Sequence, residues 1–216
     1  MMARSPLDVV RSGTLAAALI AVPALAQSEE PSRGVFVAQI GDGSRATVSQ
    51  QNSDSLANIV QEGNDNQVDL AQTGIAAHRA RIVQDGDNNV VKAEQDGAGA
   101  TDLALLQDGL GNTALVLQRE SSATATTSAE IIQSGNGNRI ILAQDGSDNT
   151  ASLTQQGDGN TMTATQIDSG NTLQWTQNGN ALADLVISQT GGATMEITQS
   201  NTGEGVQFMP PAGAGG

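Results

Sequence analysis

The sequence contains no cysteine and no tyrosine, and only one tryptophan and two phenylalanines. Without cysteine, no disulfide stabilises the fold, and with so few aromatics the core has to be filled mainly by Ala, Val, Leu and Ile. Basic residues are also scarce, with 9 Lys and Arg against 23 Asp and Glu and a formal net charge of −14. This charge argues against nucleic acid or an anionic membrane as a partner. Small aliphatic side chains suit a thin, regular interior better than a thick globular one.

The N-terminal residues have the features of a secretory signal peptide. Arg4 and Arg11 give the N-terminus a positive charge. A short apolar stretch over residues 15–25 follows and leads to Ala24-Leu25-Ala26, a small-x-small cleavage pattern. The stretch is shorter than the roughly 20 residues that span a bilayer, so no membrane span is expected in the mature chain. We therefore expect residues 1–26 to be a signal peptide and the secreted chain to begin at Gln27.

Fifteen glutamines recur at a nearly constant interval along the rest of the chain. Nine intervals are 11 residues long, three are 12, one is 10 and one is 15. The periodic glutamines are Gln39, Gln50, Gln61, Gln72, Gln84, Gln95, Gln107, Gln118, Gln133, Gln144, Gln155, Gln166, Gln177, Gln189 and Gln199. A short fixed period indicates units that cannot bury their apolar side alone and that stack on their neighbours.

The residues two and four positions before each periodic glutamine are apolar in all fifteen units. These thirty residues are Val35, Val37, Ala46, Val48, Ala57, Ile59, Val68, Leu70, Ala80, Ile82, Val91, Ala93, Leu103, Leu105, Ala114, Val116, Ala129, Ile131, Ile140, Leu142, Ala151, Leu153, Met162, Ala164, Leu173, Trp175, Leu185, Ile187, Met195 and Ile197. The residues between them are mostly polar, so the period is two, as in a strand with one inward face. Each unit therefore predicts one strand of about six residues.

Turn residues follow each predicted strand. A glycine stands two residues after the periodic glutamine in eleven units. These glycines are Gly41, Gly63, Gly74, Gly86, Gly97, Gly109, Gly135, Gly146, Gly157, Gly179 and Gly191, and the other four positions hold Asn52, Glu120, Asp168 and Asn201. Because Gly and Asn tolerate positive φ, we expect the chain to reverse direction at these positions.

The lengths of strand and turn select the architecture. A six-residue strand covers roughly 20 Å, whereas five turn residues reach at most about 17 Å, so one unit cannot close on itself. Two units can close, as strand, turn, returning strand and turn. The sequence therefore predicts an all-β fold, a two-sheet parallel β-solenoid with strand-turn-strand rungs of about 22 residues and about 15 strands.

The boundaries of this array follow from the same pattern. We expect a short polar segment over residues 27–34, the solenoid over 35–209 and a disordered tail over 210–216. Val206 and Phe208 continue the inward phase and predict one more, degenerate strand, after which Pro210 removes a donor and stops the pairing. The 15-residue interval places residues 119–127 in a longer turn, either a hinge or a tolerated loop.

The periodic glutamines share the inward phase of the apolar residues. Seven asparagines, each six residues before a periodic glutamine, also share it: Asn66, Asn89, Asn112, Asn138, Asn149, Asn160 and Asn171. A buried amide without a partner costs roughly 1–3 kcal/mol. We therefore predict a structural ladder in which identical amides stack from rung to rung and hydrogen-bond to one another. The pattern continues to both ends of the array, so we expect two uncapped ends that favour end-to-end stacking of subunits.

The spacing Gln-x-Gly-x-x-Asn-x-Ala-x-x-x-Gln, present at 107–118 and 144–155, resembles the curlin repeat of bacterial curli subunits over nearly the whole mature chain. The resemblance implies a secreted functional amyloid, a fimbrium-like fibre at the surface of a Gram-negative-type bacterium that supports cell adhesion and the biofilm matrix. Its implied partners are further copies of the chain, other curli-type subunits and an outer-membrane secretion pore. The roles of major subunit, nucleator and associated paralogue all stay open.

A monomeric secreted binding solenoid is the alternative function. Threonines and a serine fall on one outward face, as in ice-binding solenoids: Thr150, Ser152, Thr154, Thr172, Thr176, Thr194 and Thr198. Oxygen ligands suitable for Ca²⁺ stand at the turns Asp85-Gly-Asp87-Asn-Asn89 and Asp145-Gly-Ser-Asp148-Asn149. However, Gln174 and Glu196 interrupt the first pattern, and the nonapeptide period of calcium β-rolls is missing from the second.

Enzymatic function is disfavoured by the scarcity of catalytic side chains. The chain has one histidine, His78, and no cysteine. His78 stands six residues before Gln84, where other units have an asparagine, so it is expected to replace a ladder amide and not to act as a base. We predict no catalytic residue, no cofactor and no metal site.

Overall fold

The structure is a computed structural model that describes residues 33–201 and 207–209. The expected signal peptide, 1–26, and the expected disordered tail, 210–216, lie outside the described residues, as does most of the polar segment 27–34. Within the described ranges every regular element is a β-strand. No helix long and apolar enough to traverse a bilayer occurs in this part of the chain.

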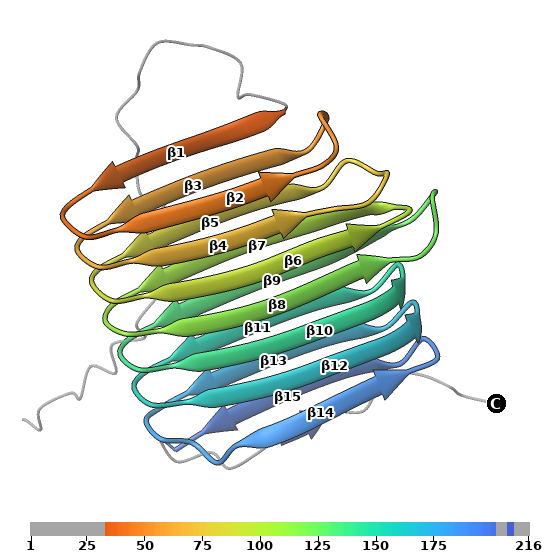
Figure 1. The fold of residues 1–216 in the computed structure, drawn as a ribbon. Coiled ribbons are helices and arrows are strands. Elements are labelled where there is room, and N and C mark those ends of the chain that lie inside the picture. Colours follow the sequence, from red (N-terminus) through yellow and green to blue (C-terminus); the bar gives the residue numbers. More distant parts are fainter. Residues whose placement is uncertain (1–32, 202–206, 210–216) are drawn as a thin grey trace, which may run out of the picture. The chain divides into compact units, whose positions relative to one another are not determined.

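The strands form two sheets, and consecutive strands alternate between them (Figure 1). The nine-stranded sheet contains β1 (Gly34–Ile40), β3 (Leu56–Glu62), β5 (Arg79–Asp85), β7 (Ala100–Asp108), β9 (Thr126–Ser134), β11 (Thr150–Gln156), β13 (Thr172–Asn178), β15 (Thr194–Ser200) and β16 (Gln207–Met209). The seven-stranded sheet contains β2 (Arg45–Gln50), β4 (Gln67–Gln72), β6 (Val90–Gly97), β8 (Thr113–Glu120), β10 (Arg139–Ser147), β12 (Thr161–Ser169) and β14 (Leu185–Thr190).

Each strand from β1 to β13 pairs in parallel with the strand two positions further along the chain. In each pair the periodic glutamines lie side by side. Gln61 aligns with Gln84 in the nine-stranded sheet, and Gln72 aligns with Gln95 in the seven-stranded sheet. The longer turn expected over 119–127 spans only 121–125, because β8 continues to Glu120 and β9 begins at Thr126. It leaves the register intact, because Gln118 still aligns with Gln144. The predicted two-sheet parallel β-solenoid is confirmed.

The core lies between the two sheets and consists of the predicted apolar pairs. Of the thirty inward residues, 23 are buried, and Ala46, Val48, Leu185, Ile187 and Met195 are partly buried against them. Val35 and Val37 of β1 are an exception, with exposures of 46% and 45%. Sequence reasoning placed both inside, but β1 belongs to the terminal rung, which has a neighbour on one side only.

Glycines at one edge of the solenoid let the backbone of successive rungs approach closely. We call the turns from an odd-numbered strand to the next strand the first corner, and the turns from an even-numbered strand the second corner. Gly41, Gly63, Gly86, Gly109, Gly135, Gly157 and Gly179 stack at the first corner. A Cβ added to Gly109 would lie 2.2 Å from the Gly135 carbonyl oxygen, and φ at Gly109 is +119°. Only glycine fits this column.

The last strand departs from the predicted array. A regular sixteenth strand would lie in the seven-stranded sheet, parallel to β14, whereas β16 returns along β15 in the nine-stranded sheet. The pairing is antiparallel, with Ile197 opposite Phe208 and Thr198 opposite Gln207. The expectation of two uncapped ends is therefore wrong for the edge of β15.

Candidate functional site: amide columns and strand edges

The glutamines of the nine-stranded sheet form a continuous hydrogen-bonded column inside the solenoid. The odd column consists of Gln39, Gln61, Gln84, Gln107, Gln133, Gln155, Gln177 and Gln199. Each Nε2 donates to the Oε1 of the next glutamine towards the C-terminus, at 2.6–3.0 Å. The column therefore has one direction, with acceptors facing the N-terminal rung.

The seven-stranded sheet has a second column with the same direction. The even column consists of Gln50, Gln72, Gln95, Gln118, Gln144, Gln166 and Gln189. Its Nε2 to Oε1 distances are 2.6–3.1 Å. The stacking of the periodic glutamines thus forms two inward columns, one on each sheet, as the sequence pattern predicts for a two-strand rung.

From Gln50 onward, the second hydrogen of each periodic glutamine amide crosses the core and fixes the orientation of the amide. Gln95 Nε2 donates to the Arg79 carbonyl at 2.8 Å, and Gln118 Nε2 donates to the Asp102 carbonyl at 3.0 Å. A flipped amide would turn its oxygen towards that carbonyl, so the direction of the column follows from the backbone. Both hydrogens are used, and no buried side-chain nitrogen or oxygen in the described part of the chain is left without a partner.

The asparagines lie at the corners and bond mainly to backbone. Asn66, Asn89, Asn112, Asn138 and Asn160 stack at the first corner, whereas Asn149 and Asn171 lie at the second. Asn89 Oδ1 accepts from the Asn112 backbone N–H at 3.0 Å, and Asn89 Nδ2 donates to the Gly109 carbonyl at 2.9 Å. Amide-to-amide bonds occur only at Asn112 to Asn89 and Asn171 to Asn149 among the described asparagines of these columns. The expected asparagine amide ladder is thus mostly a ladder of side chain on backbone.

An exposed column at the first corner escaped sequence reasoning. Three residues after the periodic glutamine stand Asp42, Asn64, Asp87, Leu110, Asn136, Asp158 and Asn180. Asp87 Oδ1 accepts from the Asn64 backbone N–H at 2.7 Å, and Asp158 Oδ1 accepts from the Asn136 N–H at 2.7 Å. Aspartate and asparagine alternate on either side of Leu110, so like charges do not stack on adjacent rungs of this column. The alternation itself is the signal that could have revealed the column.

The two ends of the solenoid present free strand edges. At the N-terminal end these are β1 and β2, and at the C-terminal end they are β14 and β15, the latter partly covered by β16. Gln39 is exposed and Gln50 half-buried, and among the described residues no donor reaches the Oε1 atom of either. The amide columns therefore run uninterrupted to edges that have no partner strand within the described chain at β1, β2 and β14.

Family comparison agrees with this geometry. The model of the curlin-associated repeat matches residues 127–157 and again 135–167, which span β9 to β12. Residues 127–167 carry curlin-associated repeats. Comparison with curated proteins and with solved structures gives no match. The strand period, the amide columns and the turn glycines of the matched curlin repeats continue through the described strands on both sides of them.

The second corner of the solenoid has more varied residues than the first. Ser55, His78, Thr101 and Thr127 are buried there, at the position that Asn149 and Asn171 occupy further along. His78 Nε2 faces the Thr73 carbonyl, and Nδ1 lies 3.0 Å from Thr101 Oγ1. A neutral ring that donates from Nε2 and accepts at Nδ1 satisfies both contacts. His78 thus joins three rungs, through Ser55 on one side and Thr101 on the other.

The charge state of His78 predicts a pH dependence of stability. Burial lowers the pKa of His78 below its ordinary value of 6.5, although the Thr73 carbonyl and the Asp96 carboxylate favour the charged form. As pH falls below 6.5 the unfolded chain takes up a proton that the folded chain does not, so the free energy of unfolding decreases, by at most about 1.4 kcal/mol per pH unit. His78→Asn, which installs the amide of other repeats, is expected to remove this part of the decrease. Urea unfolding of both monomers between pH 7 and 5 measures it, and equal slopes would contradict the prediction.

Glu120 is a functional candidate that sequence reasoning recorded only as an exception to the turn glycines. Its side chain is fully buried beneath the longer turn. Oε1 accepts from the Ser122 backbone N–H at 2.8 Å, and Oε2 accepts from Thr127 Oγ1 at 3.0 Å and the Asp148 N–H at 2.9 Å. The carboxylate therefore fastens the 121–125 turn to its own rung and to the next one. Its only sequence signal is a charge at a glycine position in the one long interval.

The alternative binding functions find limited geometric support. In the nine-stranded sheet Thr150, Thr172 and Thr194 align, as do Thr154, Thr176 and Thr198, but a column of Ser152, Gln174 and Glu196 lies between them. No group of three or more acidic, histidine or cysteine side chains in the described chain is arranged to hold a metal ion. Asp87, proposed for a calcium turn, already accepts two hydrogen bonds from Asn64.

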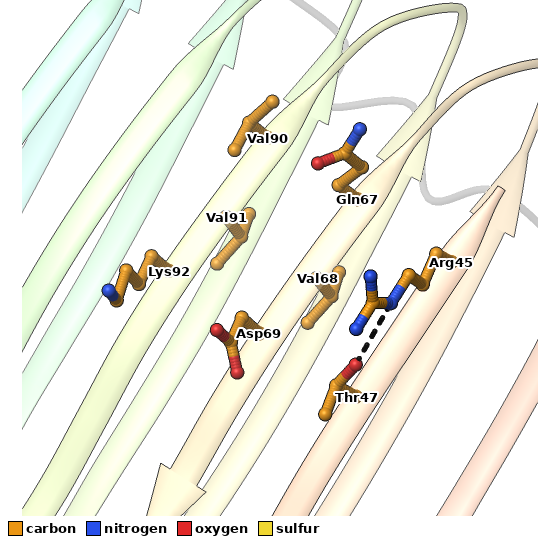
Figure 2. A pocket seen from close by; sticks show the side chains of 8 residues that line it. All are labelled: Arg45, Thr47, Gln67, Val68, Asp69, Val90, Val91 and Lys92. Atoms are coloured by element: carbon orange, nitrogen blue, oxygen red, sulfur yellow. Dashed lines mark hydrogen bonds between the residues drawn. The ribbon is translucent and has the colours of Figure 1, made fainter.

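A hollow on the outer face of the seven-stranded sheet is lined by mixed side chains (Figure 2). Arg45, Asp69 and Lys92 stand over β2, β4 and β6, with Arg45 Nε donating to Thr47 Oγ1 at 3.3 Å. The lining contains no nucleophile and base pair. It is a solvated gap between long side chains on a flat sheet.

Proposed function

We propose that the chain is a structural subunit of an extracellular, curli-like functional amyloid fibre that grows by end-to-end stacking of solenoids. The observation that carries the proposal is the continuity of the two amide columns and the parallel strands up to unpaired edges. Unpaired backbone groups at such an edge form a template for another chain. The curlin repeats support the same function.

The proposal extends to the setting of the fibre. The signal-peptide features of residues 1–26 support export, and the fibre would stand on the surface of a Gram-negative-type bacterium, where it supports cell adhesion and the biofilm matrix. Its partners would be further copies of the chain, other curli-type subunits and an outer-membrane secretion pore. The side chains that carry the function are the periodic glutamines, because they supply both the internal bonds and the free groups at the ends.

The experiment compares the secreted chain with two variants of β1. Val37→Asp places a charge on the inward face of the terminal rung. The Val37 side chain is 45% exposed in the monomer but would be buried in a stack. Ala38→Asp places the same charge on the outward face of the same strand. We expect the unmodified chain and Ala38→Asp to form dye-binding fibres with reflections near 4.8 and 10 Å. Val37→Asp should stay folded and soluble.

Two results would count against the proposal. A soluble monomer that persists for days in the unmodified chain would contradict fibre formation. Assembly of Val37→Asp at the rate of Ala38→Asp would contradict stacking through the ends, because the charge would then have avoided burial.

A further inference from the structure

The parallel array contains an odd number of strands. Eight parallel strands, β1 to β15, belong to the nine-stranded sheet, and seven belong to the other. Since consecutive strands alternate between the sheets, the next vacant position of the array lies beside β14. The position after it lies beside β15, whose edge is covered by β16 at residues 196–198. The C-terminal end is thus a step, with one sheet extending one strand further than the other.

We infer that this step receives β1 and β2 of a second copy that is turned by about half a turn around the solenoid axis. The inference rests on the proposed end-to-end assembly and specifies its geometry. β1 belongs to the nine-stranded sheet of its own copy but would occupy the seven-stranded position beside β14. Because the two sheets face each other and run in opposite directions, a half turn exchanges them and keeps the strands parallel.

A copy stacked without rotation fits less well. Its β1 would lie beside β15, and its β2 would lie one position beyond the vacant place next to β14. The outer edge of β14 would then have no partner strand at any junction. The backbone groups on the free edge of this six-residue strand would stay unpaired. Leu185 and Ile187 would also stay partly exposed at each junction, as they are in the single chain.

The side chains at the two ends match in the rotated arrangement. Extending the register of β12 and β14 aligns Gln189 with Gln39 of the second copy, and Ile187 with Val37. The free Oε1 of Gln39 then faces the Nε2 of Gln189, which in the single chain donates to the Thr172 and Ala193 carbonyls and would exchange the longer Ala193 bond for the new one. The apolar residues of the terminal rungs cover one another. In the following strand, once β16 has left the edge of β15, Gln199 aligns with Gln50, so both amide columns continue across the junction.

The outer faces give an independent indication. Phe36 and Val186 are exposed apolar side chains at opposite ends of the chain, with exposures of 42% and 75%. The half turn places them side by side, where they shield each other from water. Without rotation Phe36 would lie beside Glu196. An apolar pair that forms only in one arrangement favours that arrangement.

The absence of cysteine permits a direct test with engineered thiols. One variant carries Ala38→Cys and Ser188→Cys, the other Ala38→Cys and Thr198→Cys, and all three native side chains are exposed. Position 38 of one copy lies next to 188 of its neighbour after a half turn and next to 198 without rotation. Paired residues of neighbouring strands are about 4.8 Å apart, within reach of a disulfide, whereas the two ends of one monomer are not.

We expect oxidised fibres of the 38/188 variant to give covalent multimers on a non-reducing gel, and those of the 38/198 variant to stay monomeric. The reverse pattern, or fibres in which neither pair links, would overturn the half turn while leaving end-to-end assembly in place. If neither the variants nor the unmodified chain forms fibres, the proposed function itself fails.

Discussion

Gly109→Ala is expected to destabilise the solenoid by about 4 kcal/mol or more, because the added methyl group has no room. Its Cβ would lie 2.2 Å from the Gly135 carbonyl oxygen, and φ at Gly109 is +119°, outside the range that alanine tolerates. The neighbouring rung cannot retreat without breaking the ladder on its other side. Gly109 therefore tests whether close backbone stacking at the first corner stabilises the fold.

Gly111→Ala is the matched control two residues further along the same turn. Gly111 has φ of +65°, in the left-handed region, and a Cβ there would meet nothing within 4 Å. We expect this substitution to cost only about 1–2 kcal/mol, the penalty of the left-handed conformation. Urea midpoints of the two monomers give the comparison. Equal midpoints would show that the first corner yields easily and that the glycine column is not a constraint.

Locking β16 onto β15 with a disulfide is expected to stop fibre growth. The variant carries Thr198→Cys and Gln207→Cys, which are paired in the antiparallel register. Paired residues of antiparallel strands are about 4.5–5.5 Å apart between Cα atoms, as a disulfide requires. Since β16 covers the β15 edge at residues 196–198, β2 of a second copy cannot pair there while the bond is intact.

The same protein provides the control. Reduction should release β16 and restore growth to the rate of the unmodified chain, which has no cysteine and should be indifferent to the oxidant. Growth of seeded fibres, followed by dye fluorescence in oxidising and then reducing buffer, measures the effect. Undiminished growth in the oxidised state would show that assembly does not use the β15 edge.

The middle of the fold could be predicted from sequence because one pattern determines strand, face and register together. In each unit the two apolar residues and the glutamine point to the same side of the strand. Only one register between neighbouring strands buries all three, as where Ile82 lies beside Leu105. The end rungs carry the same pattern, yet Val35 is exposed, because burial depends on a neighbour that the sequence of a single chain does not provide.

The parts that escaped prediction depend on direction or on turn geometry. Alternation reads the same along either direction of a strand, so the phase of Phe208 could not distinguish a parallel sixteenth strand from the antiparallel β16. The spacing of Asn89 places it inward but does not show that the Gly109 carbonyl is nearer than the next amide. Glu120 gave a signal only as a charge in place of a glycine, and its three partners come from a turn and a neighbouring rung.

The common direction of the two amide columns gives the molecule an electrical polarity. Thirteen glutamine-to-glutamine bonds all point towards the C-terminal end. Side-chain dipoles aligned in this way add along the axis and polarise one another. A filament of such subunits has two chemically distinct tips. One tip offers glutamine oxygens without a donor, whereas the terminal glutamine amides of the other donate to backbone carbonyls of their own chain, so the two tips capture new subunits by different contacts and at different rates.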